Sequence, residues 1–256
     1  MSPVLKEIQN TGEATARDGT RVRVHSLIGV DEASFITEVV KEARPKVSLE
    51  VGLAYGISAL AILDGADQSI FQKHICIDPS QNGQPGWGGI GLYNLERAGF
   101  SRFVEFHEAR SYEALPRILA RGESVDFAFI DGWHTFDYTL MDFFLIDKLL
   151  RVGGVVVLDD SDWPAIRKLL RFVMTNLNYS IIRTTPRPLS FKRRMYNAAG
   201  NSLGTLGVSG WPCKVVHNVF RPELLNPDEK LGLRGSCVAL RKEGDDTRRW
   251  DHFSDF

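Results

Sequence analysis

Three aspartates and a histidine follow two apolar stretches of the sequence and could together handle a cation and a proton. Asp131 and His134 end the stretch VDFAFIDGWH, and Asp159 and Asp160 end GVVVLDD. If the two stretches form neighbouring strands, the three carboxylates converge, and their mutual repulsion raises their pKa values. A divalent cation removes that repulsion, and oxygen ligands favour Mg²⁺, with Ca²⁺ and Mn²⁺ as alternatives. We therefore predict metal ligands at Asp131, Asp159 and Asp160.

His134 lies three residues beyond Asp131. An imidazole at that position could take a proton from a hydroxyl at neutral pH as a general base. The competing interpretation is structural: Asp131 stabilises a turn, and Asp159 or Asp160 caps the next helix. Asp162 is itself an adequate helix N-cap, so we expect it to cap the helix and to leave the other two acids for the site.

A glycine-rich turn and a separate acid indicate a nucleoside-containing ligand. LEVGLAYGISAL places Gly52 and Gly56 between an apolar run and a helical one, where glycine allows a tight turn and close approach of a ligand. Asp78 follows the next apolar run, about 22 residues after Gly56, which suits an acid that accepts hydrogen bonds from ribose. The plainer alternatives are an ordinary strand-to-helix turn, and an Asp78 that caps the turn at Pro79.

The elements that must position these residues alternate between two patterns. Short β-rich runs lie at 46–51, 73–78, 103–107, 125–131 and 154–159, with segments of helical spacing between them. This alternation predicts an α/β fold with a mostly parallel sheet covered on both faces, whose ligands gather at the carboxyl ends of the strands. The helix before the fifth run should stop at Gly153 and Gly154, and its exposed acids should be Asp137, Asp142 and Asp147.

Further elements flank this core. The spacing predicts helices over 31–45 and 162–178, strands over 179–184 and 235–243, and a small hairpin around the Asp18-Gly19 pair. A length of 256 residues suits one domain, 1–256. Its expected parts are an N-terminal helical and hairpin extension (1–45), a core (46–184), an insertion serving as a lid or oligomer contact (185–234), and a last strand with a tail (235–256).

The composition argues against polyanionic partners. Lys and Arg number 31 against 32 Asp and Glu, so the net charge is −1, and we expect no nucleic acid and no membrane as partner. No uncharged apolar stretch approaches the roughly 18 residues of a membrane span. The three cysteines lack metal-ligand spacing and fit a reducing, cytoplasmic location. The basic residues Arg183, Arg187, Lys192, Arg193 and Arg194 are expected to form a solvated or subunit-facing surface rather than an anion site.

LEVGLAYGISAL, ICIDP, VDFAFIDGWH and LLRVGGVVVLDD together resemble the class I S-adenosylmethionine-dependent methyltransferases. The nearest branch contains the metal-dependent catechol-type and caffeoyl-CoA-type enzymes and the antibiotic or sugar O-methyltransferases. The resemblance covers roughly residues 30–184 and resumes at 235–241. It implies a Rossmann-like three-layer α/β/α sandwich with seven strands in the order 3-2-1-4-5-7-6, strand seven antiparallel. It also implies methyl transfer from S-adenosylmethionine to a hydroxyl of a small molecule, with a divalent cation and with His134 and Asp131 as catalytic residues.

The resemblance also assigns a cofactor site, residue by residue. Its members are Glu50 and Gly52 at the methionine part, Ala54, Tyr55 and Gly56 in the turn, Ser58 near the carboxylate, Asp78 at the ribose, Arg110 and Ser111 beside the adenine, and Asp131. Two positions depart from the family. Ala54 replaces a glycine of many methyltransferases, and Asp160 replaces an asparagine of the catechol-type enzymes, which makes the site more negative.

Other functions remain open at this point. One is a metal-independent methyltransferase with His134 as base. Others are a nucleoside-binding protein without transfer activity and an aminopropyl-transferring relative on the same fold. A nicotinamide oxidoreductase has the least support, because its phosphate-binding glycine pattern is missing. Substrate choice should rest with the loop 80–93 and the insertion, and a homo-oligomer is plausible.

Overall fold

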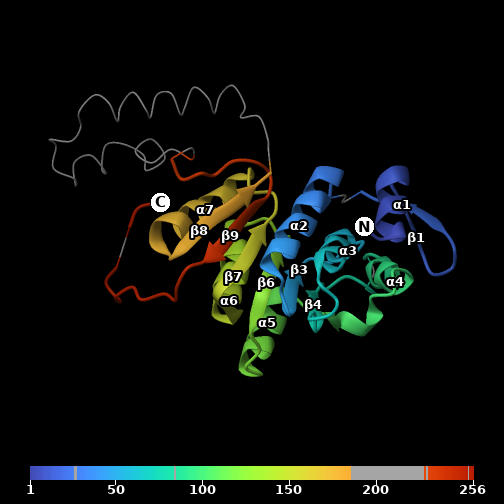
Figure 1. Ribbon diagram of the computed structural model, residues 1–256, viewed down its shortest axis with the longest axis horizontal. Helices are drawn as coiled ribbons and strands as arrows, with labels where there is room; N and C mark the ends of the chain where they lie inside the picture. Colours follow the sequence, from blue (N-terminus) through green and yellow to red (C-terminus); the bar gives the residue numbers. More distant parts are fainter. Residues whose placement is uncertain (26–27, 84, 186–227, 229, 253) are drawn as a thin grey trace.

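The computed structural model describes residues 1–25, 28–83, 85–185, 228, 230–252 and 254–256. Seven strands form one sheet in the order β5-β4-β3-β6-β7-β9-β8 (Figure 1). Their bounds are β3 Val47–Val51, β4 Lys73–Ile77, β5 Val104–His107, β6 Val125–Ile130, β7 Leu150–Leu158, β8 Tyr179–Thr184 and β9 Val238–Lys242. β9 is antiparallel to both β7 and β8, and the remaining neighbours are parallel. The predicted fold class and strand order are thereby confirmed.

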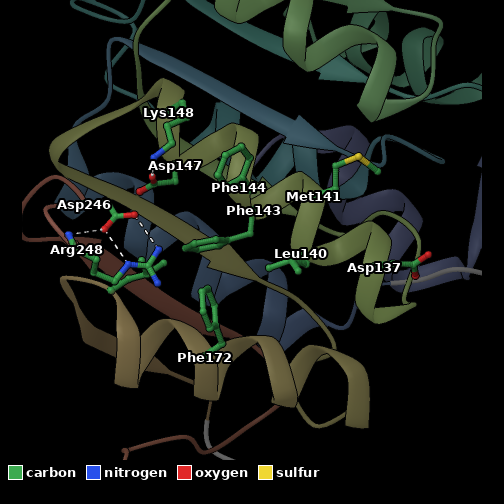
Figure 2. A pocket seen from close by; sticks show the side chains of 11 residues that line it. Asp137, Leu140, Met141, Phe143, Phe144, Asp147, Lys148, Phe172, Asp246 and Arg248 are labelled. Atoms are coloured by element: carbon green, nitrogen blue, oxygen red, sulfur yellow. Dashed lines mark hydrogen bonds and ion pairs between the residues drawn. The ribbon is translucent and has the colours of Figure 1, made fainter. Parts of the chain in front are cut away.

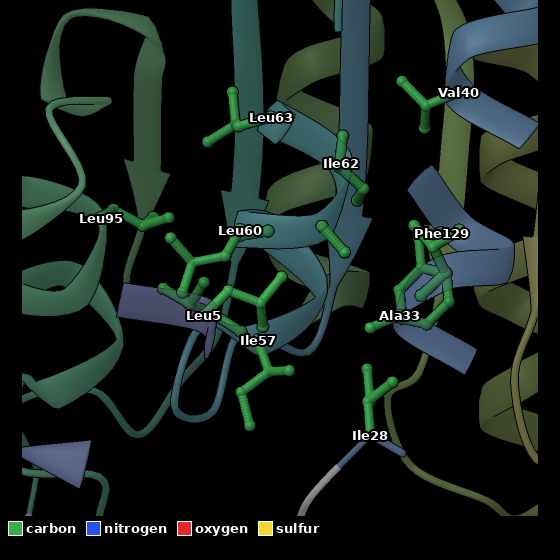
Figure 3. Packing of buried hydrophobic residues seen from close by; sticks show 14 of the residues in the cluster. Leu5, Ile28, Ala33, Val40, Ile57, Leu60, Ile62, Leu63, Leu95 and Phe129 are labelled. Carbon is green, nitrogen blue, oxygen red and sulfur yellow. The ribbon is translucent and has the colours of Figure 1, made fainter. Parts of the chain in front are cut away.

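Helices cover both faces of the sheet. One layer contains α1 (Pro3–Thr11), α2 (Val30–Ala43), α3 (Ile57–Gly65) and α4 (Ile90–Arg97), and the other α5 (Ser111–Ala120), α6 (Phe136–Leu149) and α7 (Pro164–Asn176). Figure 3 shows the first layer, where Leu60 and Ile62 of α3 pack among residues of α1, α2 and β6. Because α3 is enclosed by other elements, nearly every residue along it is buried. The strands read as continuous apolar runs because both of their faces are covered.

The hairpin and most helices match their predictions. The hairpin pairs β1 (Glu13–Thr15) with β2 (Arg21–Arg23), and its register joins Ala14 to Val22. The sequence analysis missed α1, which Ser2 caps by accepting a hydrogen bond from the Leu5 N–H, and a short 3-10 helix at Ser101–Phe103.

Three local predictions were wrong. Gly153 and Gly154 do not end α6, which stops at Leu149; they lie inside β7, where the pairing with β6 is irregular. Asp162 is not the N-cap of α7, because Trp163 holds that position and makes no side-chain capping bond. Of the three acids expected at the surface of α6, only Asp137 is exposed; Asp142 and Asp147 are buried against neighbouring elements.

In the part of the chain described here, no helix is both long and apolar enough to cross a membrane. The predicted insertion at 185–234 lies mostly outside the described residues, as do the basic residues Arg187, Lys192, Arg193 and Arg194. Arg183 is described, and its guanidinium pairs with Glu38 and Glu42 of α2. It therefore acts as part of a surface ion-pair network.

Candidate active site

The carboxyl ends of β6 and β7 bring Asp131, His134 and Asp160 together. The Nε2 atom of His134 lies 3.3 Å from Oδ1 of Asp131 and 3.2 Å from Oδ2 of Asp160. The strands set this arrangement, because Ile130 pairs with Leu158, and the residues that follow leave the sheet side by side. Nε2 is buried and has no hydrogen bond of good geometry. The imidazole nitrogen thus lies between the two carboxylates.

Asp160 adopts a left-handed backbone conformation, with φ of 46°. A residue with a side chain pays about 1 kcal/mol for this conformation, although aspartate tolerates it better than most. The backbone N–H of Trp163 donates to the Asp160 carbonyl at 2.8 Å, so the chain turns sharply at this point. An outlier of this kind at the end of a central strand is typical of functional sites.

Asp159 lies beside this group but has separate partners. Its Oδ1 accepts a hydrogen bond from the Cys237 thiol at 2.7 Å, and Glu32 lies close to both. Asp159 is 8% exposed, and burial together with the charge of Asp131 raises the pKa of its carboxyl to about 7. The structure therefore brings two of the three predicted metal ligands, Asp131 and Asp160, together with His134, whereas Asp159 groups with Glu32 and with Cys237, the residue before β9.

The charge balance of the site suits a cation. Burial raises the pKa of Asp131, and the hydrogen-bonding contact with Asp131 raises the pKa of His134. Ligating atoms of Asp131, His134 and Asp160 all lie within 4.8 Å of one another. The carboxylate oxygens of Asp131 and Asp160 suit Mg²⁺ or Mn²⁺. These residues fit a divalent ion, and a protonated His134 offers partial neutralisation of the same acids.

The glycine turn after β3 packs directly against this cluster. A Cβ on Gly52 would lie 2.0 Å from the carbonyl oxygen of Asp131, so only glycine fits at this position. Gly52 and Gly56 have φ of 95° and 76°, and Ala54 between them has φ of 45°. Ala54 thus takes a left-handed conformation that favours glycine.

Asp78 holds the same turn from the end of β4. Its Oδ2 accepts hydrogen bonds from the N–H groups of Leu53 at 3.1 Å and Ala54 at 2.8 Å, and its Oδ1 accepts from Ser80 at 2.7 Å. Asp78 is 3% exposed. The capping interpretation therefore describes what Asp78 does in this structure, and its place beside the turn also leaves it next to any ligand bound there.

The other predicted cofactor residues surround the turn in different ways. The buried Ser58 donates to Oε2 of the buried Glu50 at 2.9 Å. The Tyr55 hydroxyl and Nδ1 of His25 are 2.9 Å apart, and both rings contact Trp87 of the loop 80–93. That loop is therefore tied to the N-terminal segment.

Arg110 and Ser111 stand at the start of α5. Arg110 is exposed, and its guanidinium lies 6.0 Å from the ring of Tyr112. Ser111 is buried and bonds to the carboxyl of Asp142, whose pKa burial raises to about 6. Asp142 also lies against Gly132, next to the catalytic candidates.

Two tryptophans that the sequence analysis passed over border the site. Trp133 is 70% exposed and Trp163 is 51% exposed. The ring of Trp163 lies 5.1 Å from that of His134. Their positions in DGWH and SDWP, next to the predicted ligands, were the signal that could have identified them. Exposed indole faces beside a polar cluster favour a ligand that carries a ring.

A cavity of about 500 Å³ lies elsewhere, between α6 and α7 (Figure 2). Its lining includes Leu140, Phe143 and Phe172, with the ion-paired Asp246 and Arg248 at one end. None of the predicted catalytic, cofactor or metal residues is among the described residues that line it. We place the candidate active site at the strand ends, where the polar groups converge, and not in this cavity.

The comparisons with known proteins match the part of the chain that contains these strand ends. Residues 49–161 match the family model described as a methyltransferase domain. This region contains the glycine turn, Asp78, and the group formed by Asp131, His134 and Asp160. With the observed strand order and relatives named as O-methyltransferases, this match supports the resemblance to the class I S-adenosylmethionine-dependent methyltransferases.

Particular relatives come from plants and bacteria. Tricin synthase 1 of Oryza sativa subsp. japonica is 33% identical over 139 residues, 52% of this chain and 52% of that protein. Caffeoyl-CoA O-methyltransferase 2 of Petunia hybrida is 28% identical over 162 residues, 62% of this chain and 61% of the relative. The chain thus spans about half the length of the first of these relatives.

Solved structures show the same fold. The O-methyltransferase TomG of Streptomyces achromogenes, involved in tomaymycin synthesis and solved with SAM, has a TM-score of 0.55 at 18% identity, covering 72% of this chain and 84% of that one. The O-methyltransferase of Bacillus cereus, solved with SAH, has a TM-score of 0.53 at 21% identity, covering 61% and 74%. At these identities the likeness concerns the fold.

Proposed function

We propose that this chain, as one domain, is a methyltransferase that uses S-adenosylmethionine to methylate a hydroxyl of a small molecule, assisted by a divalent cation. The observation that carries the proposal is the convergence of Asp131, His134 and Asp160 next to the glycine turn after β3. The plant relatives named as O-methyltransferases support it. We further propose that the cofactor residues are those assigned by the resemblance, with Asp159 as the third metal ligand.

The residues divide the chemistry between them. When bound, S-adenosylmethionine supplies a methyl on a positively charged sulfur, and a divalent cation supplies positive charge that favours an ionised hydroxyl. His134 would take the hydroxyl proton as general base, and the acceptor oxygen would receive the methyl group that the cofactor would supply. Asp131 and Asp160 orient the imidazole and stabilise it after protonation. Trp133 and Trp163 support an acceptor with a ring.

A second candidate is a metal-independent methyltransferase. The specific observation in its favour is the position of His134, whose Nε2 already lies between the two carboxylates where a cation is expected. In that case Asp159 and Asp160 serve a structural role. The free, buried thiols of Cys76 and Cys237 are compatible with the cytoplasmic location that we propose for either candidate. A homo-oligomer stays a prediction.

Calorimetry with S-adenosylhomocysteine, followed by transfer assays on phenolic and sugar hydroxyls, tests the proposal. His134→Gln should lower turnover by about 10²- to 10⁴-fold, the usual contribution of a general base, and leave cofactor binding intact. His252→Gln, at an exposed histidine, is the matched control. Absence of cofactor binding in the unaltered chain would exclude methyl transfer.

Metal removal separates the two candidates. For the metal-assisted enzyme, a chelator should abolish turnover, Mg²⁺ or Mn²⁺ should restore it, and Asp160→Ala should abolish it. Full activity of the chelated enzyme and of Asp160→Ala would instead establish the metal-independent mechanism.

A further inference from the structure

Four buried polar side chains form a continuous chain that ends at the glycine turn. Nδ1 of His74 lies 2.8 Å from the Ser48 hydroxyl, Nε2 of His74 lies 3.3 Å from Oε1 of Glu50, and Ser58 donates to Oε2 of Glu50 at 2.9 Å. Ser48, Glu50 and His74 are 0% exposed, and Ser58 is 3% exposed. This chain crosses from β4 to β3 and from β3 to α3 within the core.

Strand pairing puts these side chains on one face. Ser48 is the register partner of His74, and Glu50 is the register partner of Cys76. Side chains two apart on a strand share a face. Ser48, Glu50, His74 and Cys76 therefore all point toward the layer that contains α3. The apolar residues between them, Leu49 and Ile75, face the opposite layer. Ser58 is the second residue of α3, so it meets Glu50 directly.

Such a network costs stability unless every member is satisfied. Burying a carboxylate is unfavourable without partners, and an apolar set of the same size would be cheaper. Oε1 of Glu50 and Nε2 of His74 face each other without a hydrogen bond of good geometry. Burial and the charge of Glu50 raise the pKa of the neighbouring Cys76 thiol, which therefore stays protonated. A buried polar network that lowers stability, with one contact that is not a good hydrogen bond, points to a role in the site.

The network ends where an amino-acid group would bind. Ser58 lies in the first turn of α3, where backbone N–H groups without helical partners favour a carboxylate. A Ser58 hydroxyl that donates to Glu50 turns its oxygen lone pairs outward, and these can accept from an ammonium. S-adenosylmethionine carries one ammonium and one carboxylate, both on its methionine part. Because Glu50 is fully enclosed, it acts on such a ligand through Ser58.

We propose that His74 is a positioning residue for the amino-acid part of the cofactor: it holds the Glu50 carboxylate, which in turn fixes the Ser58 hydroxyl at the start of α3. The inference rests on the proposed function, since it assumes that S-adenosylmethionine binds at this turn. It adds a residue of β4 that contacts no ligand itself. It also predicts that the effect of His74 is confined to one end of the cofactor.

A truncated ligand tests this directly. Calorimetry on the full chain compares S-adenosylhomocysteine with 5′-methylthioadenosine, which has the same nucleoside but no amino-acid group. His74→Leu should weaken the binding of S-adenosylhomocysteine by about tenfold, because it removes a buried polar contact to a charged group, and should leave the binding of 5′-methylthioadenosine unchanged. His74→Gln, whose amide can still donate to Glu50, should restore most of the loss.

Two further variants keep the test decisive if His74→Leu does not fold. Ser58→Ala should reproduce the selective loss. Tyr179→Phe is the control, because it breaks another buried hydrogen bond, to Asp147, far along the sheet, and should not alter the ratio of the two affinities. The inference would be overturned if His74→Leu or Ser58→Ala weakened the binding of both ligands equally, or changed the affinity for neither ligand. Failure of the unaltered chain to bind S-adenosylhomocysteine would instead refute the proposed function.

Discussion

At the scale of single residues, Asp142 shows how burial changes what a side chain does. It is 1% exposed and lies between Ser111 and Gly132. It therefore connects the predicted adenine side of the site to the loop that carries Asp131 and His134. Helical spacing suggested a solvent-facing acid, but the packing of α6 against α5 encloses it. An enclosed acid that ionises at neutral pH costs folding free energy, and this cost can be measured.

Asp142→Asn should therefore stabilise the fold, and more so at high pH. Burial raises the pKa of Asp142 from 3.8 to about 6, so the folded state holds the proton more tightly. The stability from this proton is fully present below pH 4 and is lost as the pH rises through 6. Since asparagine does not titrate, the advantage of the variant should grow by about 2 kcal/mol between pH 4.5 and 7.5 in urea unfolding.

Asp126→Asn provides the opposite control. Burial raises the pKa of Asp126, but hydrogen bonds from Arg151 and from the backbone of Val47 and Lys46 lower it further, so that the net shift is downward. Its neutral variant should lose stability at pH 7.5. Equal destabilisation by Asp142→Asn at both pH values would mean that the Asp142 carboxylate is itself required for folding.

At the scale of elements, the turn between β3 and α3 is limited by space at Gly52 and by backbone conformation at Ala54. Gly52 has no room for a side chain because the Asp131 carbonyl lies against it, whereas Ala54 has room but an unfavourable φ. The turn is held on its other side by Asp78. Strand β6, strand β4 and the turn thus form one unit that sets the position of Asp131.

Substitutions in the turn should reveal this asymmetry. Gly52→Ala should destabilise the protein by roughly 2–4 kcal/mol, because it pushes the Asp131 backbone away. Ala54→Gly should stabilise it by about 1 kcal/mol, by removing a side chain from a left-handed conformation. Urea unfolding of both variants checks the signs. A tolerated Gly52→Ala would show that β3 and β6 can separate at this end.

At the scale of the whole molecule, the last strand completes the site. β9 lies between β7 and β8. The residue before it, Cys237, donates a hydrogen bond from its thiol to Asp159. At its other end, the 3%-exposed Lys242 donates to the carbonyl oxygens of Asp147 at 2.7 Å and Leu150 at 3.0 Å. Cys237 and Lys242 therefore contact Asp159, the end of α6 and the start of β7, all of which are far from them in the sequence.

Lys242→Met should cost about 2–4 kcal/mol, because it leaves two buried carbonyl oxygens without their donor and removes one of the two lysines beside the Asp147 carboxylate. The free energy of unfolding in urea measures the loss. Lys41→Met, on the exposed side of α2, is the matched control and should change stability by less than about 0.5 kcal/mol. A Lys242→Met variant as stable as the control would show that β9 is anchored by its strand pairing alone.

The sequence by itself determined the fold class and the acids at the carboxyl ends of the strands. Apolar runs such as VDFAFI and GVVVL are long enough to specify buried strands, and in a parallel sheet their ends must meet at one edge. The resemblance added the order of the strands and the antiparallel last strand, which local pattern alone does not specify. The edge that holds Asp131, Asp159 and Asp160 was therefore predictable from composition and order along the chain.

Only the tertiary structure decided the partners of each side chain. That His134 lies between Asp131 and Asp160, that Cys237 bonds to Asp159, and that His74 supports Glu50 all depend on register and rotamers across elements distant in the sequence. Helical period also misassigned Asp142, since it reports which residues share a face but not which neighbour covers that face. Local sequence sets the elements, and long-range packing sets the chemistry that their side chains can perform.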